Sequence, residues 1–532
     1  MRCRLPRWPV TRAILLAAAC TAAPDSTADP AVPAVPAAEP TPAALGEHIR
    51  VLAHDSMEGR GTGTPGYARA ARYVVAQFEK LGLEPAGTDG WFQPVRLSHA
   101  RTESGSVVLN GPGDARTLVR DADFIAVPDP VRPTSEVTAA MVIAGFGVTA
   151  PGLSWDDYKD VDARGKIVIL VSGAPSSFPA TERAHYATAR EKMRNAVAHG
   201  AVGIIATRSR ETTFPWDRQV RQARGGAMRW LGPDGAPADV FPGIRAIASL
   251  SDSAGAALLA GTLPGTATIG VTTRHTELAS PNIAALLRGS DPRLRDEFVV
   301  ITAHLDHLGV GQPVSGDSIY NGALDNASGT AALLEVARAF AAMPERPRRS
   351  ILFLAVTGEE MGLLGSDYFA QHPTVPKERI VANVNIDGLS ILYPFRDAVA
   401  FGSEHSTLDS VVARAAAGMG VALGPDPFPQ EAFFVRSDQY SFVRQGIPSV
   451  FLFMGFKGDS GLDAAARFRG WMAGRYHTPQ DDLDQPMDLE AGARHATLTW
   501  RVALEIANAE ERPAWKEDSF LGRMFGQTRG AE

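Results

Sequence analysis

Histidines and carboxylates follow several apolar runs in the second half of the chain. In chain order they are His304, Asp306 and His307, then Asp325, then Glu359 and Glu360, then Asp387, and last Tyr476 and His477. One such residue alone is most often a cap or a loop hydrogen-bonding group. Together they offer imidazole nitrogen and carboxylate oxygen without thiolate, which are ligands of zinc, with manganese or cobalt as substitutes.

Charge arithmetic favours two metal ions over one. Carboxylates in this number repel one another away from water unless cations neutralise them. Two Zn²⁺ bring +4, the carboxylates of Asp325, Glu360 and Asp387 bring -3, and a bridging hydroxide brings -1. The set is then neutral if His304 and His477 bind as neutral imidazoles, whereas one ion would leave an excess of negative charge.

The elements that must position these residues read as an α/β domain from Ser280 to Ala509. Apolar runs of strand length, EFVVITA, SILFLAV, RIVANVNI and SVFLF, alternate with helical stretches such as Gly329 to Ala342. Continuous apolar runs indicate strands buried on both faces, and therefore a mixed, largely parallel sheet flanked by helices. The candidate residues then meet where parallel strands place catalytic groups, at their carboxyl ends.

This ordered set closely resembles the M28 family of dizinc exopeptidases, bacterial aminopeptidases with a phosphorylase/hydrolase-like α/β core. The matching motifs are His-x-Asp, Asp-Asn-x-x-Gly, Gly-Glu-Glu, Asn-x-Asp-Gly and Tyr-His, with LAHDSMEGR and GTPGY near the N-terminus. The resemblance covers about Ala44 to Ala509.

The resemblance implies a role for each residue. His304 and Asp387 would bind one zinc, Glu360 and His477 the other, and Asp325 would bridge both, next to a cis Asp325-Asn326 peptide bond. Glu359 would be the general base for a metal-bridging water or hydroxide. Asp306 would hold the His304 imidazole by its other nitrogen. Tyr476 would donate its hydroxyl to the oxyanion, or else only pack beside His477.

Some neighbouring residues are set apart from this site. We interpret His307 as a loop histidine rather than a third imidazole ligand, and His54, His405 and His495 lie outside the strand-end set. Gln439 stands where the family often has histidine, which puts the substrate contacts in doubt. Four aromatic residues could wall a side-chain pocket or belong to the core: Phe433, Phe434, Tyr440 and Phe442.

Residues 134–273 read as a small inserted α/β domain. The runs AAMVIAGFGV, GKIVILVSG and VGIIATRS are typical of strands, and a helix is expected from Ala187 to His199 between the last two. The segment resembles the protease-associated (PA) domain, a known insertion in the M28 family. It contains no catalytic cluster, and both a structural spacer and a substrate gate are compatible with it.

The N-terminus reads as an export signal. Arg2, Arg4, Arg7 and Arg12 precede the apolar run from Ala13 to Ala19, the layout of a signal peptide over residues 1–19. Cys20 follows in an imperfect lipobox, so the alternatives are a lipid on Cys20 or plain cleavage. The protein would then be periplasmic or attached to the cell envelope as an outer-membrane lipoprotein, or otherwise secreted. No apolar stretch reaches the roughly 18 residues of a transmembrane helix.

The remaining boundaries complete the expected organisation. An Ala/Pro-rich tether spans 20–43, the N-terminal part of the catalytic domain 44–133, the metallopeptidase domain 274–512 and a C-terminal tail 513–532. The chain of 532 residues carries a formal charge of -7, and this mild acidity without long basic runs argues against nucleic acid as a partner. Both cysteines, Cys3 and Cys20, precede the folded part, which excludes disulfides from it.

The sequence therefore predicts an exported dizinc aminopeptidase that acts on peptides. One alternative keeps the site and changes the reaction to that of a carboxypeptidase or a glutaminyl cyclase. Another is a non-catalytic, receptor-like binding protein, which the presence of all five ligands and the base disfavours. A serine hydrolase is disfavoured because no Gly-x-Ser-x-Gly motif lies at a strand-to-helix turn.

Overall fold

The structure is a computed structural model that describes residues 39–111, 115–209, 215–260, 265–389, 391–458 and 461–526. The expected signal peptide, Cys20 and most of the tether lie outside the described residues. Helix α1 (Pro42–Leu52) begins with Thr41 as its N-cap, two residues before the expected end of the tether.

Four parallel strands form the centre of the sheet, as predicted. They lie in the order β16 (Ser350–Val356), β13 (Phe298–His304), β17 (Ile380–Ile386) and β20 (Ser449–Met454), and every residue in them is buried. Beyond β20 lie the antiparallel strand β18 (Asp397–Phe401) and the short edge strand β19 (Ala422–Leu423).

Helices cover both faces of this sheet because side chains of a strand alternate between faces. Phe353 of β16 packs against Phe340 of α7 (Gly329–Ala341), which contacts Trp500 of α12 (Leu489–Asn508). The adjacent residues Leu352 and Leu354 point the other way, into a cluster with α8 (Leu364–Gln371) and α10 (Gln439–Val443). This arrangement leaves the carboxyl ends of the strands open for polar side chains.

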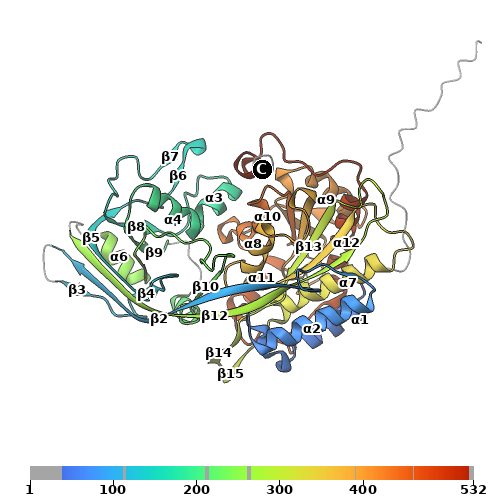
Figure 1. Cartoon of the computed structure of the whole chain (residues 1–532), viewed down its shortest axis with the longest axis horizontal. Coiled ribbons are helices and arrows are strands. Elements are labelled where there is room, and N and C mark those ends of the chain that lie inside the picture. Colours follow the sequence, from blue (N-terminus) through green and yellow to red (C-terminus); the bar gives the residue numbers. More distant parts are fainter. Residues whose placement is uncertain are drawn as a thin grey trace, which may run out of the picture. The chain divides into compact units, whose positions relative to one another are not determined.

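A long two-stranded ribbon extends the sheet beyond β16 (Figure 1). Strand β12 (Thr266–Leu287) pairs with β2 (Phe92–Asn110) along most of its length. The last residues of β12 pair with β16, whereas its first residues pair with β5 (Thr134–Ile143). One strand therefore belongs both to the sheet of the four parallel strands and to the inserted segment.

The inserted segment is a small α/β layer, here called the inserted module (described residues between 124 and 260). Strands β5, β8 (Ile167–Val171), β9 (Gly203–Thr207) and β11 (Ala246–Leu250) are parallel, and β4 (Phe124–Val127) is an antiparallel edge. The helix expected from Ala187 to His199 is α4 (Ala189–Ala198), which begins two residues later because Thr188 caps it. A further helix, α3 (Ala180–Ala187), precedes it and was not expected. Helices α5 (Trp216–Arg224) and α6 (Asp252–Ala260) complete it.

The remaining helices and strands include α2 (Pro65–Lys80), whose Phe78 packs on Phe353 of β16, and several shorter elements. The shorter ones are β1 (Glu84–Pro85), β3 (Arg116–Thr117), β6 (Thr149–Ala150), β7 (Trp155–Asp156), β10 (Ala227–Trp230), β14 (Gly309–Val314), β15 (Asp317–Tyr320), α9 (Leu408–Ala417), α11 (Ala464–Gly474) and α13 (Phe520–Phe525).

A buried arginine ties the N-terminal segment to the loops at the sheet edge. Arg60 is fully buried and donates hydrogen bonds to four backbone carbonyls at 2.6 to 2.9 Å. The acceptors are Leu52, Leu305, Asn321 and Gly322. Burial lowers the pKa of Arg60 to about 10, and carboxylates such as Asp481 and Asp325 oppose this shift. The guanidinium therefore fixes the loops that precede Asp306 and Asp325.

We expect Arg60→Gln to lower the apparent free energy of unfolding by about 3 kcal/mol, because several charge-assisted hydrogen bonds would be lost in a buried place. Urea unfolding followed by fluorescence measures this change. The matched control is Arg50→Gln, which removes an exposed pair with Glu47 and should change stability by less than about 1 kcal/mol. Equal urea midpoints for the two variants would show that the hydrogen bonds of Arg60 do not stabilise the fold.

Candidate metal centre

The fold brings the predicted residues to the edge formed by the carboxyl ends of the four parallel strands, here called the edge of the catalytic sheet (β16, β13, β17 and β20). His304 ends β13, Glu359 and Glu360 follow β16, and Asp387 follows β17. Asp325 lies in a helical turn (Ala323–Ser328) that leads into α7, and His477 lies after α11. Their donor atoms form two clusters that share one residue.

The first cluster contains His304, Asp387 and Asp325. The Nε2 atom of His304 lies 3.2 Å from Oδ1 of Asp387 and 3.4 Å from Oδ1 of Asp325. Its Nδ1 atom lies 3.1 Å from the backbone oxygen of Asp306 and can donate to it. A proton on Nδ1 leaves the Nε2 lone pair facing the two carboxylates, which suits a metal ligand.

The second cluster contains His477, Glu360 and the same Asp325. The Nε2 atom of His477 lies 3.2 Å from Oδ2 of Asp325 and 3.1 Å from Oε2 of Glu360. Asp325 therefore directs one carboxylate oxygen toward each cluster. This is the geometry that a carboxylate shared by two cations requires.

His307, interpreted from the sequence as a loop histidine rather than a third imidazole ligand, lies beside the second cluster. Its Nδ1 atom lies 2.7 Å from Oε1 of Glu360 and 3.9 Å from Oδ2 of Asp325. The imidazole is buried, and its Nε2 has no hydrogen-bond partner among the described residues. Glu360 thus presents one oxygen to His307 and the other to His477. The only hint in the sequence was that His307 follows His304 by three residues, directly after the end of β13.

Hydrogen bonds to the backbone hold the loops that carry these residues. The carboxylate of Asp306 accepts the N–H of Glu359 at 3.1 Å and that of Glu360 at 3.4 Å. It lies 3.9 Å from Nδ1 of His304, so the expected contact with the imidazole comes instead from the backbone oxygen of Asp306. Asp306 therefore positions the Glu359-Glu360 segment.

Two further polar side chains fix the loop of Asp325, and the sequence interpretation did not identify their contacts. The carboxylate of Asp481 accepts the N–H of Leu324 at 2.9 Å and that of Asp325 at 3.0 Å. The side chain of Asn326 bonds backbone groups of the loops after β13 and β17. The Asp325-Asn326 peptide bond is cis, as the family resemblance implies.

Burial and crowding shift the pKa values of the carboxylates in opposite directions. Burial and repulsion by Asp387 and Glu360 raise the pKa of Glu359 well above its usual range, although His304 opposes this. Burial alone would also raise the pKa of Glu360, but attraction by His477 outweighs it, and the pKa falls to about 2. In turn, Glu360 and Asp325 overcome the effect of burial and raise the pKa of His477 to about 10. Positive charge would therefore stabilise the two clusters, and their nitrogen and oxygen donors suit divalent cations.

Tyr476 and Arg436 lie beside the clusters. The ring of Tyr476 stacks on His477 with a centroid separation of 3.8 Å, and burial raises the pKa of its hydroxyl. That hydroxyl lies 3.4 Å from Nη2 of Arg436. Both residues face the cavity that contains Asp325, Glu359 and Asp387.

The cavity at the clusters is small and mostly apolar. It measures about 70 Å³, and its apolar wall includes Phe433, Phe453, Phe468, Trp471 and Met472. Of the four aromatic residues weighed for a side-chain pocket, only Phe433 lines this cavity. The other three are Phe434, Tyr440 and Phe442, which are buried. Gln439 is also buried and accepts from Asn385 at 2.8 Å, so it supports the loop rather than the cavity.

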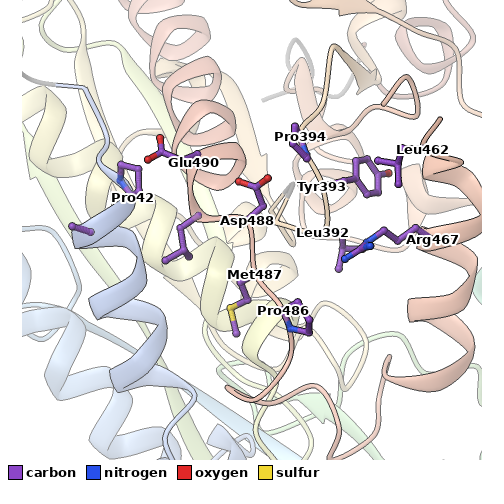
Figure 2. A pocket seen from close by; sticks show the side chains of 12 residues that line it. Pro42, Leu392, Tyr393, Pro394, Leu462, Arg467, Pro486, Met487, Asp488 and Glu490 are labelled. Carbon is purple, nitrogen blue, oxygen red and sulfur yellow. The ribbon is translucent and has the colours of Figure 1, made fainter. Parts of the chain in front are cut away.

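A wider hollow lies away from the strand ends, at the N-terminal ends of α1 and α12 (Figure 2). It measures about 800 Å³ and is lined by residues such as Pro42, Tyr393, Arg467 and Met487. Its carboxylate Asp488 already accepts the backbone N–H of Ala491 as the cap of α12. No histidine lines this hollow, so it lacks the ligand set of the strand-end clusters.

Comparison with known proteins gives concordant matches. Residues 282–503 match the model of peptidase family M28. Aminopeptidase YwaD of Bacillus subtilis (strain 168) is 28% identical over 246 residues, 45% of this chain and 44% of that protein. A probable zinc metalloprotease of Pyrenophora tritici-repentis (strain Pt-1C-BFP) is 38% identical over 106 residues, 20% of this chain and 23% of that protein. The chain thus spans less than half the length of these curated relatives.

A solved structure shares the fold. The aminopeptidase from Aneurinibacillus sp. strain AM-1 superposes with a TM-score of 0.56 at 21% sequence identity. The match covers 89% of this chain and 96% of that one, so it includes both the catalytic sheet and the inserted module. The α/β architecture is therefore one that known proteins adopt over nearly the whole described chain.

We expect His307→Ala to weaken zinc binding at the second cluster by about 10- to 100-fold, because Glu360 would lose the imidazole that orients it. Titration against a chromophoric chelator measures the two affinities. The control His372→Ala changes an exposed histidine outside the clusters and should leave both affinities unchanged. Wild-type zinc binding by His307→Ala would show that His307 takes no part in holding metal.

Proposed function

Since residues 282–503 of this chain match the model of peptidase family M28, we propose that the protein is a zinc metalloexopeptidase that removes N-terminal residues from peptides. The observation that carries this proposal is the position of Asp325. Its two carboxylate oxygens face two separate clusters of imidazole and carboxylate, at 3.4 Å from His304 and 3.2 Å from His477.

Each chain would hold two Zn²⁺, with Mn²⁺ or Co²⁺ as substitutes. His304 and Asp387 would bind one ion, Glu360 and His477 the other, and Asp325 both. His307 would orient Glu360 through its 2.7 Å contact and so leave the other oxygen of Glu360 for metal. When bound, zinc polarises a carbonyl group and lowers the pKa of water.

The residues beside the metal ligands would transfer the proton and stabilise the negative charge that forms on the substrate. Glu359 faces the cavity and has a raised pKa, which suits a base that takes a proton from water and returns it to the leaving amine. The Tyr476 hydroxyl beside Arg436 would donate to the oxyanion of the tetrahedral intermediate. Asp306 would keep Glu359 and Glu360 in place through their backbone N–H groups.

The shape of the cavity supports an exopeptidase. About 70 Å³ with an apolar wall accommodates one apolar side chain beside the clusters, not an extended peptide on both sides of the cleaved bond. We therefore propose that the residue removed is apolar. The name of the Bacillus subtilis relative supports aminopeptidase activity over the carboxypeptidase and cyclase alternatives.

The proposed location is outside the cytoplasm. It is supported by the charged and apolar pattern of residues 1–19, which precedes the Ala/Pro-rich tether and Cys20. Lipid attachment at Cys20 would hold the protein at the cell envelope. Throughout the part of the chain that the structure describes, each helix is too short or too polar to cross a bilayer.

We expect Glu359→Gln to retain zinc and lose peptidase activity by about 10²- to 10⁴-fold, because the amide cannot accept the proton. Elemental analysis should find two zinc ions per chain in both proteins, and hydrolysis of leucyl-4-nitroanilide gives the rate. Glu345→Gln, an exposed substitution on the loop after α7, is the control and should keep the full rate. Near-normal turnover by Glu359→Gln would show that Glu359 is not the base. Fewer than two zinc ions per chain in the fully active enzyme would contradict the two-metal site.

A peptide panel distinguishes the exopeptidase types. We expect Leu-Gly-Gly to be cleaved with release of leucine, and N-acetyl-Leu-Gly-Gly to resist cleavage because its terminus is blocked. Mass spectrometry of the products identifies the bond that is broken. Release of the C-terminal residue from the acetylated peptide would establish a carboxypeptidase, and cyclisation of an N-terminal glutamine would establish a glutaminyl cyclase.

A further inference from the structure

The inserted module contains a cavity of about 350 Å³, here called the module cavity, and all the residues that line it belong to the module. It lies at the carboxyl ends of the neighbouring parallel strands β8, β9 and β11, which contribute Leu170, Ala206 and Ser249 among others. The carboxyl ends of parallel strands are the usual place for a ligand in an α/β layer. The volume is also in the range of pockets that bind small molecules.

Most of the wall of the module cavity is apolar. Met193 of α4, Ile204 of β9 and Ile247 of β11 line it, together with Phe241 and Ile244. The same five side chains form part of the hydrophobic core between the strands and α4 or pack against it. Met193 and Phe241 are only half-buried, so part of this apolar surface is uncovered. A ligand that fills the cavity therefore needs an apolar group.

One guanidinium in this wall lacks the partners that a charge away from water requires. Arg229 lies on β10 between Met228 and Trp230, which are buried in a cluster with Leu364 of α8. Because side chains alternate along a strand, Arg229 points to the opposite face, where it lines the module cavity. Its Nη1 atom donates to the backbone oxygen of Met228 at 2.7 Å. Its buried Nε atom and its Nη2 atom have no hydrogen-bond partner among the described residues.

The charged residues that line the module cavity leave an excess of positive charge. They are three cations, Lys192, Arg229 and Arg245, and two acids, Asp129 and Asp239. Each acid already pairs with an arginine outside the lining: Asp129 with Arg132 at 3.1 Å, and Asp239 with Arg190 at 2.8 Å. Within the part of the chain that the structure describes, none of the three cations forms an ion pair with a carboxylate. The lining therefore favours an anionic group on the ligand.

Lys192 adds a fixed positive charge, and Arg229 has the donors that remain for a ligand. The ammonium of Lys192 donates to the backbone oxygens of Phe146, Gly173 and Val171 at 2.5, 2.6 and 3.3 Å, which uses its three donors. Burial lowers the pKa of Lys192 to about 8, so the group is mostly charged at neutral pH. Burial also lowers the pKa of Arg229, which attraction by Asp239 opposes.

We propose that the module cavity binds a small molecule that joins a carboxylate to an apolar group, with the carboxylate on the guanidinium of Arg229. Guanidinium groups form strong, charge-assisted hydrogen bonds with carboxylates. Because both acids of the lining are held by arginines, the cavity offers no unpaired carboxylate to an ammonium group. The ligand is therefore an apolar carboxylic acid without an amino group. This site is separate from the metal centre, and the inference does not rest on the proposed exopeptidase function.

Isothermal titration of the full-length zinc protein tests the ligand class with three compounds of similar shape: 3-phenylpropanoate, 3-phenylpropanamide and L-phenylalanine. We expect the acid to bind about tenfold more tightly than the amide, because the amide cannot form charge-assisted hydrogen bonds with Arg229. L-phenylalanine should bind about tenfold more weakly than the acid, because its ammonium group would lose water without gaining a partner. Equal affinity for L-phenylalanine and the acid would keep the site and identify free amino acids as its ligands.

We expect Arg229→Gln to weaken binding of 3-phenylpropanoate by about tenfold. Ala189→Trp should weaken it as well, because it places a large side chain at an exposed position of the lining and changes no charge. Arg224→Gln removes an exposed pair with Asp121 elsewhere in the module and is the matched control, with the affinity of the wild type. All three variants should bind as much zinc as the wild type, since none of them changes the metal centre.

Two outcomes would overturn the inference. One is a wild-type protein that binds the acid no more tightly than the amide, or that gives no heat with the acid up to about 10 mM. The other is wild-type affinity for the acid in Arg229→Gln, which is also the result expected if the acid binds only to zinc. If Arg229→Gln does not fold, wild-type affinity in Ala189→Trp overturns the inference in the same way. Failure of the protein to cleave any peptide would instead remove the proposed function and leave this test unchanged.

Discussion

Mutual repulsion among four carboxylates is the constraint on which the catalytic half depends. Asp325, Glu359, Glu360 and Asp387 meet at one sheet edge, buried or half-buried, where like charges are costly. Imidazoles lie between them: His304 and His477 each contact two carboxylates at 3.1 to 3.4 Å. Such a group of charges can persist only if the surrounding backbone holds it rigidly and if cations compensate it.

Buried polar side chains hold the backbone around these charges rigidly, because they form hydrogen bonds with backbone groups of the loops. The carboxylate of Asp306 accepts two consecutive backbone N–H groups and fixes the loop of Glu359. The carboxylate of Asp481 does the same for the loop of Asp325. Arg60 also holds these loops, because its guanidinium donates to the carbonyl oxygens of Leu305, Asn321 and Gly322. Its charge also offsets part of the negative potential of the clusters.

The sequence allowed the central strands and the strand-end residues to be predicted, because fully apolar runs indicate buried parallel strands and their carboxyl ends share an edge. It did not reveal the part that His307 takes, since a loop histidine has no local pattern that reports a partner 53 residues away. The contacts of Asp481 and Arg60 were missed for the same reason. The helix expected from Ala187 to His199 is present as α4, which begins at Ala189 because Thr188 is its N-cap. Phe434 and Phe442 belong to the core because their neighbours bury them, which apolar character alone does not decide.

The β2–β12 ribbon has a consequence for how this architecture can change. Because β12 pairs with β5 at one end and with β16 at the other, the two parts of the chain share continuous backbone hydrogen bonds rather than a hinge. Deleting the module would strip hydrogen-bonding partners from β12 and leave an exposed strand edge of the kind that promotes aggregation. The inserted module is therefore a structural part of the central sheet of this chain, and its loops can change with less effect on the sheet than its strands.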